Sequence, residues 1–414
     1  MRASTVLRVL LGIQDLATRG FHLDASGLVV DVVPTWTIPR CGECGAQCRS
    51  IHDGRERRWR QHDLAGMTLH LRYRIRRAHC ADCGTVKTER VPWAAHGSNF
   101  TYAFEERAGF LVQQCNKTAV SKLLRTTWRT LGTLVRRVVA RTLAADGDRL
   151  EGLRLIGVDE LSYRRHHEYV TVVVDHERRR IVWAARGKSA ATLKRFFEEL
   201  GPERCAKLEA VTIDLSAAYI KAVNEASPAA TLIFDRFHVQ RLVHDALDET
   251  RRDQVREAQG KEAKAALKGT RWALQKSPWN LTDVEVQTLA QLERSNRPLF
   301  RAHLLKESLA AILDGRQINI ARRRLLQWIA EARRSRLPHF KRVARTIERH
   351  LDGILEYIRV RLTNGPVEGL NGKARTITRR AFGFHSASAL IAMLFLCCGG
   401  VHVTPAFSAL EGFH

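Results

Sequence analysis

The sequence predicts a multidomain α/β protein with a large all-α insertion, preceded by a cysteine-rich module and a short helical domain. Two cysteine pairs near the start predict the module. Three consecutive strand patterns and then an alternation of helix and strand, between residues 153 and 239, predict the α/β domain. More than a hundred residues of helical periodicity before Leu362 predict the insertion. A chain of 414 residues has room for two or three such domains.

The composition indicates a polyanionic partner. The formal net charge is +25, with 68 Lys and Arg against 43 Asp and Glu spread along the whole chain. Each cation that meets a phosphate releases condensed counterions, so this distribution favours nucleic acid, although an ordinary basic protein is the alternative. The opening residues predict no signal peptide, and the longest apolar run, Ala389 to Val401, is too short to span a membrane. We therefore expect a cytoplasmic protein with a buried C-terminal helix.

The cysteine pairs predict one structural zinc ion. Cys41 and Cys44 form one CxxC pair, Cys80 and Cys83 form the other, and 35 residues separate the pairs. Two residues between cysteines let a tight turn direct both sulfur atoms at one ion, and four thiolates make a closed zinc site. The alternating segment 67–75 predicts a strand that brings the pairs together. Cys48 and His52 lie nearby and are interpreted as unligated neighbours.

Arginines between the cysteine pairs predict contact with DNA or RNA, because a guanidinium binds phosphate in a fork. A solvated charged face is the alternative. The candidates are Arg72, Arg74 and Arg76.

Residues 102–143 predict a helix-turn-helix. One helix is expected over 104–114, a second is capped by Asn116 or Thr118, and a third follows the pair Arg125 and Thr126. A DNA-reading helix-turn-helix needs two short helices joined by a tight turn. A plain three-helix bundle fits the same pattern. The candidate DNA-contacting residues of the third helix are Arg129, Arg136 and Arg137.

The order of elements in the α/β domain resembles that of ribonuclease H-like domains. The segments 153–160, 169–177 and 180–186 predict three antiparallel strands. A helix, a strand at 210–216, a second helix and a strand at 231–239 follow, and this alternation predicts parallel pairing. The comparison of topologies supports a fold and does not prove a function.

Two aspartates close strands of this predicted sheet. Asp159 closes the first strand and Asp214 closes the fourth, so both are expected at one edge of the sheet. Glu368, near the start of a later helix, supplies a third carboxylate. Three carboxylates can hold two Mg²⁺ ions about 4 Å apart, an arrangement suited to in-line displacement at a phosphodiester. Helix capping or a turn is the ordinary alternative for each aspartate.

Further polar residues accompany this group. Asp235 and His238 follow the fifth strand and could orient the site or simply fix the strand end; Asp235 is the alternative second metal ligand. Glu160 and Asp175 are interpreted as turn residues. The cations after Glu368 are expected to hold a phosphate backbone. These cations are Lys373, Arg375, Arg379 and Arg380.

The helical insertion carries three tryptophans, Trp272, Trp279 and Trp328, which we interpret as aromatic anchors. The dipeptide Ser277-Pro278 predicts a helix start. The insertion could cover the active site, bind DNA ends or support dimerisation.

From Cys41 to Phe384 the chain resembles the ISL-three family of insertion-sequence transposases. The motifs that carry the resemblance are CGEC, CADC, IGVDE, VTIDLSAAYIKAV, FDRFHV and NGPVEGLNGKARTITRRAFGF. The family often has proline after the first cysteine, whereas this chain has Gly42. The resemblance implies a DDE transposase with a ribonuclease H-like catalytic domain split by a helical insertion. It also implies that Asp159, Asp214 and Glu368 form the triad and that Asp235 and His238 match a DxxH element.

The resemblance further implies Mg²⁺-dependent chemistry, with Mn²⁺ as a substitute, at the terminal inverted repeats of the element. Hydrolysis at the element's end would precede attack of the freed 3′ hydroxyl on target DNA. A homodimer or larger synaptic assembly on DNA is expected, associated with the bacterial nucleoid. The expected segments are an N-terminal arm (1–35), the zinc-binding module (36–98), the helix-turn-helix (99–150), the first part of the catalytic core (151–245), the helical insertion (246–360) and the second part of the core with the C-terminal helix (361–414).

Two other classes of protein fit part of the pattern. A structure-selective nuclease would use a similar acidic cluster without joining strands. An inactive DNA-binding regulator would need only the N-terminal modules, and the intact acids argue against it.

Overall fold

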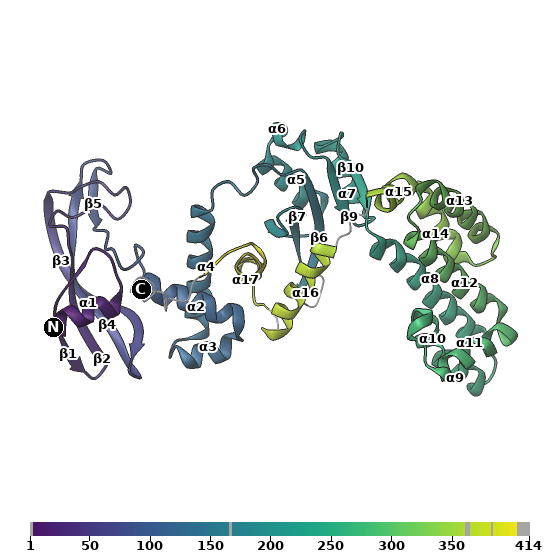
Figure 1. Ribbon diagram of the computed structural model, residues 1–414, viewed down its shortest axis with the longest axis horizontal. Helices are drawn as coiled ribbons and strands as arrows, with labels where there is room; N and C mark the ends of the chain where they lie inside the picture. The colour runs from purple at the N-terminus through teal and green to yellow at the C-terminus, as the bar shows by residue number, and fades with distance from the viewer. Residues whose placement is uncertain (1–2, 165–167, 361–364, 382–383, 404–414) are drawn as a thin grey trace. The chain divides into compact units, whose positions relative to one another are not determined.

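The computed structural model describes residues 3–164, 168–360, 365–381 and 384–403, with the side chains at 3–4, 164, 365–368, 371 and 378 outside the described set. The chain divides into two compact units (Figure 1). The first contains residues 1–147 together with residues from 392 onward, and the second contains residues 148–391. The finer division into six segments stays a prediction.

The first unit begins with a five-stranded sheet. Its elements are α1 (Ala3–Leu11), β1 (Leu16–Asp24), β2 (Gly27–Pro34), β3 (Ser50–Leu64), β4 (Met67–Cys80) and β5 (Thr85–Thr88). The strand order is β1-β2-β4-β3, and β5 pairs with β4. The predicted strand at 67–75 is confirmed as part of β4. Trp59 and Trp93 pack edge to face with ring centroids 5.5 Å apart, and both rings are buried. Apolar burial of this kind stabilises the sheet.

Three helices follow: α2 (Tyr102–Gln114), α3 (Lys117–Leu123) and α4 (Trp128–Ala145). The side chains of Thr101, Asn116 and Thr127 each accept a backbone N–H in the first turn of the following helix. Such caps satisfy donors that have no partner within the helix. Arg125, in the turn after α3, has a φ of 48°, which reverses the chain between the two helices. The predicted helices and the cap at Asn116 are confirmed.

The sheet of the second unit has the order β10-β9-β6-β7-β8. The strands are β6 (Leu155–Arg164), β7 (Glu168–Asp175), β8 (Arg180–Arg186), β9 (Ala210–Ile213) and β10 (Thr231–Phe234). β6, β7 and β8 pair antiparallel, whereas β6, β9 and β10 pair parallel. Because the crossovers α5 (Ala190–Leu200), α6 (Pro202–Cys205) and α7 (Ala217–Ala226) separate the parallel strands, the predicted ribonuclease H-like order is confirmed.

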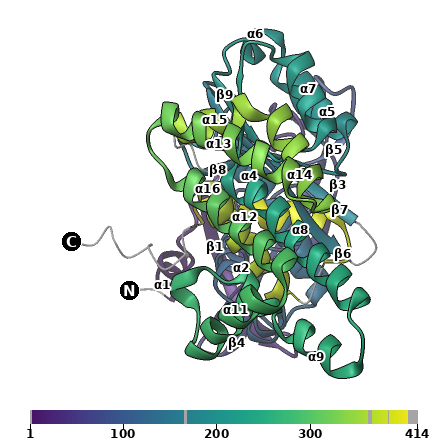
Figure 2. The ribbon, with the colours of Figure 1, turned by 90° about the vertical axis from the view of Figure 1, so that its right-hand side faces the viewer.

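A helical domain continues from β10. It contains α8 (Arg236–Glu257), α9 (Lys261–Gly269), α10 (Arg271–Gln275), a 3-10 turn (Pro278–Asn280), α11 (Asp283–Ser295), α12 (Arg297–Asp314), α13 (Ile318–Arg334), α14 (Pro338–Arg349) and α15 (Leu351–Val360). Figures 1 and 2 show α8 beside α12 and α14. Trp328 is buried in this domain, but Trp272 and Trp279 are 64% and 78% exposed. The prediction that these two tryptophans act as anchors is therefore wrong.

One hydrophobic core runs from the sheet into the helical domain, because buried residues of β6, α8, α12 and α15 belong to a single cluster. The chain then forms α16 (Gly365–Arg380), which packs against β6, and α17 (Ala387–Cys398). Buried Leu390, Leu394 and Leu396 confirm the predicted C-terminal apolar helix. None of the helices in the described part of the chain has both the length and the apolar character needed to cross a membrane.

Gly353 allows α15 to approach β10, the strand that leads to Asp235. A Cβ at this position would lie 2.5 Å from ring carbons of Phe234 and 3.0 Å from the carbonyl oxygen of Leu232. We expect Gly353→Ala to lower the free energy of unfolding by about 1–3 kcal/mol through overpacking. For a unit of this size, thermal denaturation should show a fall of about 2–4 °C in melting temperature for each kcal/mol.

Gly269→Ala is the matched control, because no heavy atom lies within 4 Å of the Cβ that this change adds. Its melting temperature should be unchanged or higher, since alanine favours helix over glycine by about 1 kcal/mol. Equal melting temperatures for the two variants would contradict the packing argument.

Candidate active site

Three aspartates lie at one level across the parallel strands of the second unit. The register places one row of residues opposite one another: Gly157 of β6, Thr212 of β9 and Ile233 of β10. Asp159, Asp214 and Asp235 each follow one of these residues by two positions in the chain. Because neighbouring strands lie about 4.8 Å apart, equal register brings the three positions together at the carboxyl ends of β9 and β10. The register thus brings Asp159 and Asp214 to one level, but the prediction that Asp159 closes its strand is wrong, because β6 continues to Arg164.

Local hydrogen bonds fix the first two carboxylates. Oδ1 of Asp159 accepts the backbone N–H of Glu160 at 2.6 Å, and Oδ1 of Asp214 accepts the N–H of Ser216 at 3.0 Å. Both side chains are partly exposed, whereas Asp235 is only 4% exposed. Asp235 directly precedes α8 and His238 lies in the first turn of that helix, partly buried. The start of α8 thus carries the predicted polar pair to the end of β10.

Glu160 is a fourth carboxylate beside this row. It lies inside β6 opposite Thr171, so the prediction that it is a turn residue is wrong. Burial raises the pKa of Glu160, a hydrogen bond with Tyr219 lowers it, and the charges of the neighbouring aspartates raise it. The alternation of Leu161 and Tyr163 after it was the available signal that the strand continues. Asp175, by contrast, accepts N–H groups of the following turn, as predicted.

The hydroxyl of Tyr219 is held between the sheet and α7. It lies 2.9 Å from Oγ1 of Thr171, which donates to the carbonyl oxygen of Gly187 at 2.8 Å. Tyr219 is 1% exposed, and burial together with the charge of Glu160 raises its pKa well above the usual range. The phenol therefore stays protonated, and its hydrogen bond with Glu160 holds that carboxylate beside the aspartates.

The helix that contains Glu368 packs against β6, the strand of Asp159 (Figure 1). The backbone of Glu368 belongs to α16, but its side chain lies outside the described residues. Leu370, Ala374 and Ile377 form a buried stripe at helical spacing. The predicted phosphate-binding cations lie off this stripe: Lys373, Arg375 and Arg379 are exposed and Arg380 is partly exposed.

The donor chemistry of this edge suits Mg²⁺ or Mn²⁺, because carboxylate oxygens are the ligands that hard divalent ions prefer. The described carboxylates do not gather as tightly as the cysteines: within the described ranges, only Cys41, Cys44, Cys80 and Cys83 form a group of three or more such ligands within 4.8 Å. Mutual repulsion favours this spacing of carboxylates, and a divalent ion would offset it.

The four cysteines have the geometry of a tetrahedral zinc site. Their sulfur atoms lie within 4.8 Å of one another, with Cys41 to Cys83 at 3.9 Å and Cys44 to Cys80 at 3.4 Å. A zinc–sulfur distance of about 2.3 Å in a tetrahedron requires sulfur atoms roughly 3.8 Å apart. The residues therefore fit one structural zinc ion.

The neighbours of the cysteine site behave as predicted. Sγ of Cys48 donates to the carbonyl oxygen of Ala46, and His52 pairs with Asp53. Gly42 donates its N–H to the carbonyl oxygen of Thr88 at 3.0 Å, and a Cβ there would lie 2.6 Å from that oxygen. A proline could not donate this hydrogen bond.

The six arginines predicted to contact DNA in the first unit fall into two sets. Arg74, Arg129 and Arg136 are exposed. The other three have carboxylate partners within the unit: Arg72 with Asp31, Arg76 with the buried Glu89, and Arg137 with the buried Glu105. Because burying an unpaired carboxylate is costly, the last two pairs hold the fold together.

Comparison with known proteins agrees with the resemblance. A transposase family model of the ISL3 type matches residues 156–394, the helix-turn-helix domain of transposase family ISL3 matches residues 89–139, and the zinc-finger of transposase IS204/IS1001/IS1096/IS1165 matches residues 38–83. The transposase for insertion sequence element IS1557 of Mycobacterium tuberculosis is 37% identical over 97% of this chain and 96% of its own length. The transposase for insertion sequence element IS1001 of Bordetella parapertussis is 30% identical over 86% of this chain and 88% of its own length. The chain therefore belongs to the ISL-three (ISL3) family of insertion-sequence transposases.

Proposed function

We propose that this transposase binds the terminal inverted repeats of its own element and cleaves and joins DNA with divalent ions held by Asp159, Asp214 and Glu368. The observation that carries the proposal is the common level of Asp159 and Asp214 in the parallel register, with α16 packed against the strand of Asp159. Two Mg²⁺ ions bound there would activate the attacking oxygen and stabilise the leaving oxygen of a phosphodiester displacement.

The protein's own groups position the DNA strand. Lys373, Arg375 and Arg379 on the exposed side of α16 hold backbone phosphates near the carboxylates. Asp235 and His238 support the edge in this proposal: the buried Asp235 lies where β10 meets α8, and His238, in the first turn of α8, binds a phosphate oxygen. The same carboxylates serve hydrolysis at the element's end and attack by the freed 3′ hydroxyl.

The exposed arginines of the helix-turn-helix and the zinc module read the element end in this proposal. Both ends must be joined, so a homodimer or larger synaptic assembly acts on the DNA. The enzyme works in the cytoplasm, on the bacterial nucleoid. Its two ion types have separate roles: one zinc ion is structural, and the two Mg²⁺ ions, or Mn²⁺ ions in their place, are catalytic.

Glu368→Gln tests the third ligand. We expect loss of both cleavage and strand transfer with retained DNA binding, because glutamine keeps the size of the side chain and removes its charge. The assay incubates the full chain with Mg²⁺ and a duplex that carries the element end, and resolves the products on a denaturing gel. Glu293→Gln, an exposed change in α11, is the control and should behave as wild type.

The wild-type products separate the three functional classes. Strand transfer products support the transposase reaction, nicks without joining support a structure-selective nuclease, and binding alone supports an inactive regulator. Full activity of Glu368→Gln would remove this residue from the site.

A further inference from the structure

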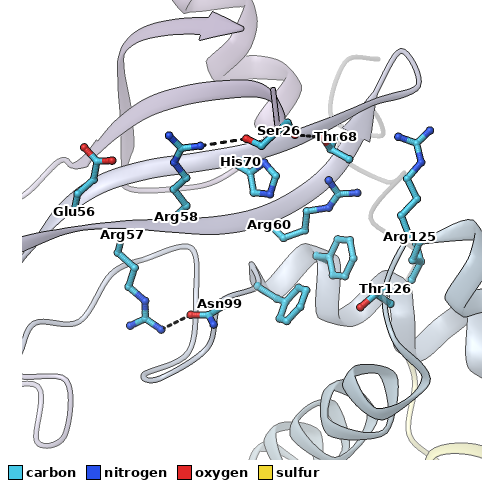
Figure 3. A pocket seen from close by; sticks show the side chains of 13 residues that line it. Ser26, Glu56, Arg57, Arg58, Arg60, Thr68, His70, Asn99, Arg125 and Thr126 are labelled. Carbon is cyan, nitrogen blue, oxygen red and sulfur yellow. Dashed lines mark hydrogen bonds between the residues drawn. The ribbon is translucent and has the colours of Figure 1, made fainter. Parts of the chain in front are cut away.

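A cleft in the first unit has four arginines and one glutamate, Glu56, among its thirteen lining residues. It lies between the β3–β4 hairpin and the α2–α3 region and has a volume of about 740 Å³, within the range of ligand-binding sites (Figure 3). Its lining includes Arg57, Arg58, Arg60, His70, Phe100, Phe104 and Arg125. Arg57, Arg58 and Arg60 belong to the arginine-rich segment between the cysteine pairs, for which the sequence predicts contact with DNA or RNA.

The walls of the cleft are fixed to each other by backbone hydrogen bonds. The N–H of Arg60 donates to the carbonyl oxygen of Asn99 at 2.9 Å, and the N–H of Thr101 donates to the carbonyl oxygen of Arg60 at 3.0 Å. On the far side, Nη2 of Arg125 donates to the carbonyl oxygen of Gly66 at 2.9 Å. The hairpin and the helices therefore present the cleft as one preformed site, which lowers the entropy cost of binding a ligand.

Positive charge is crowded in the cleft. Arg57 donates to two neutral acceptors, the carbonyl oxygen of Ser98 and Oδ1 of Asn99, and neither acceptor carries a negative charge that would offset its own. Arg58 pairs with Asp24 at 2.8 Å, and Asp63 is shared by Arg60 and by Arg125, the latter at 3.8 Å. Burial lowers the pKa of Arg57 and of Arg60. The charges of Arg55 and Arg137 lower the pKa of Arg57 further, whereas for Arg60 the charge of Asp63 raises the pKa and that of Arg125 lowers it. An anion in the cleft would offset this repulsion.

His70 adds an unsatisfied polar atom to the cleft wall. It lies opposite Arg60 in the β3–β4 register, and Figure 3 shows its ring between Arg58 and Arg60. Its Nδ1 is buried and has no hydrogen-bond partner among the described residues. A buried polar atom without a partner costs about 1–3 kcal/mol, so a ligand that satisfied Nδ1 would recover that energy.

The remaining wall is apolar. Phe100 and Phe104 stack with ring centroids 5.2 Å apart, and the buried Leu124 lies beside them in the lining. A free phosphate would use only the cationic wall. A nucleotide unit of a DNA strand has a phosphate for the arginines and an apolar deoxyribose face for Phe100, which is partly exposed, whereas Phe104 is only 1% exposed and lies behind it.

We propose that this arginine cleft, formed by β3, β4 and the turn after α3, binds a backbone phosphate of element-end DNA together with its sugar. The proposal rests on the proposed function, since it takes the DNA partner from there. It adds that the hairpin and the helix-turn-helix contact the same DNA segment, through Arg58, Arg60 and Arg125.

The test measures how binding of the full chain to DNA depends on salt, without added Mg²⁺ or Mn²⁺, so that no cleavage intervenes. The variants are Arg58→Gln and Arg125→Gln, and the duplexes are an element-end sequence and a scrambled sequence of equal length. Each lost phosphate contact should make the slope of log affinity against log salt shallower by about 0.9. The affinity deficit of each variant should therefore shrink about 3.5-fold between 50 and 200 mM salt. Because a phosphate contact does not read sequence, both duplexes should show the same change.

Arg77→Gln is the matched control. Arg77 lies on β4, outside the cleft lining, and pairs with Asp53 as Arg58 pairs with Asp24. Its salt slope should equal that of wild type. Circular dichroism and zinc content should show that all three variants are folded.

Other outcomes overturn the proposal. Equal slopes in the cleft variants and wild type, or an equal loss in Arg77→Gln, would show that the cleft holds no particular phosphate. If inorganic phosphate raises the melting temperature of wild type but not of the cleft variants, while their DNA slopes are unchanged, the cleft takes free anions. Failure of wild type to bind the element end would instead overturn the proposed function.

Discussion

Asp159→Asn should abolish cleavage and strand transfer while element-end binding stays at the wild-type level. Asparagine keeps an Oδ1 that can accept the N–H of Glu160, so the local structure of β6 is retained. It removes a charge from a group in which Asp214 and Glu160 already repel one another. Loss of outer partners of a metal site commonly costs about 10–100-fold, so removal of a direct ligand should reduce the cleavage rate at least about 100-fold.

Three measurements check this result. Denaturing gels with Mg²⁺ and element-end DNA give the cleavage rate, mobility shifts give DNA affinity, and calorimetry with Mn²⁺ gives metal affinity. Asp245→Asn is the control, because Asp245 is 70% exposed on α8 and away from the row of aspartates. The melting temperature of Asp159→Asn should be unchanged or higher, since functional acid clusters oppose stability. Normal cleavage by this variant would remove Asp159 from the assigned role.

Cys80→Ser should release zinc and unfold the N-terminal sheet region, with loss of element-end binding. Cys80 is fully buried, and its sulfur lies 3.4 Å from that of Cys44. Metal binding in zinc-finger peptides contributes about 10–16 kcal/mol of apparent free energy, far more than the rest of a small module can replace. Atomic emission should find no zinc, and a mobility shift should find no specific complex.

Cys48→Ser controls for the loss of a buried thiol. Cys48 lies beside the site, but its sulfur donates to the carbonyl oxygen of Ala46, and a serine hydroxyl can do the same. This variant should keep one zinc ion per chain and bind DNA. The unit of residues 148–391 has its own core, so Cys80→Ser should retain that unit's thermal transition. One zinc ion per chain in Cys80→Ser would contradict the four-cysteine assignment.

Much of the fold could be predicted from local sequence patterns. The cap at Asn116, the strand after Met67 and the change from antiparallel to parallel strands each depend on a few neighbouring residues. The common level of Asp159 and Asp214 also follows from local signals, because each residue comes at the end of a short apolar run.

Long-range pairing set the limits of prediction. Arg76 occurs in a basic run, but its buried partner Glu89 lies outside its strand. Arg137 also occurs in a basic run, and its buried partner Glu105 lies on another helix. Charge density along a sequence does not show which cations are neutralised in this way. Glu160 is a different case: the alternation of Leu161 and Tyr163 after it indicates a continuing strand, and the pairing of β6 with β7 shows that strand.

The backbone hydrogen bonds that join Arg60 to Asn99 and Thr101 hold the zinc-module hairpin and the helix-turn-helix at a fixed spacing. B-DNA turns about 34–36° per base pair. One inserted base pair would therefore rotate one half of a recognised sequence relative to the other half, away from the module that contacts it. With the proposed function, the ends of the element must therefore keep the spacing of their recognised base pairs as strictly as the bases themselves, and insertions or deletions there should be rarer than substitutions.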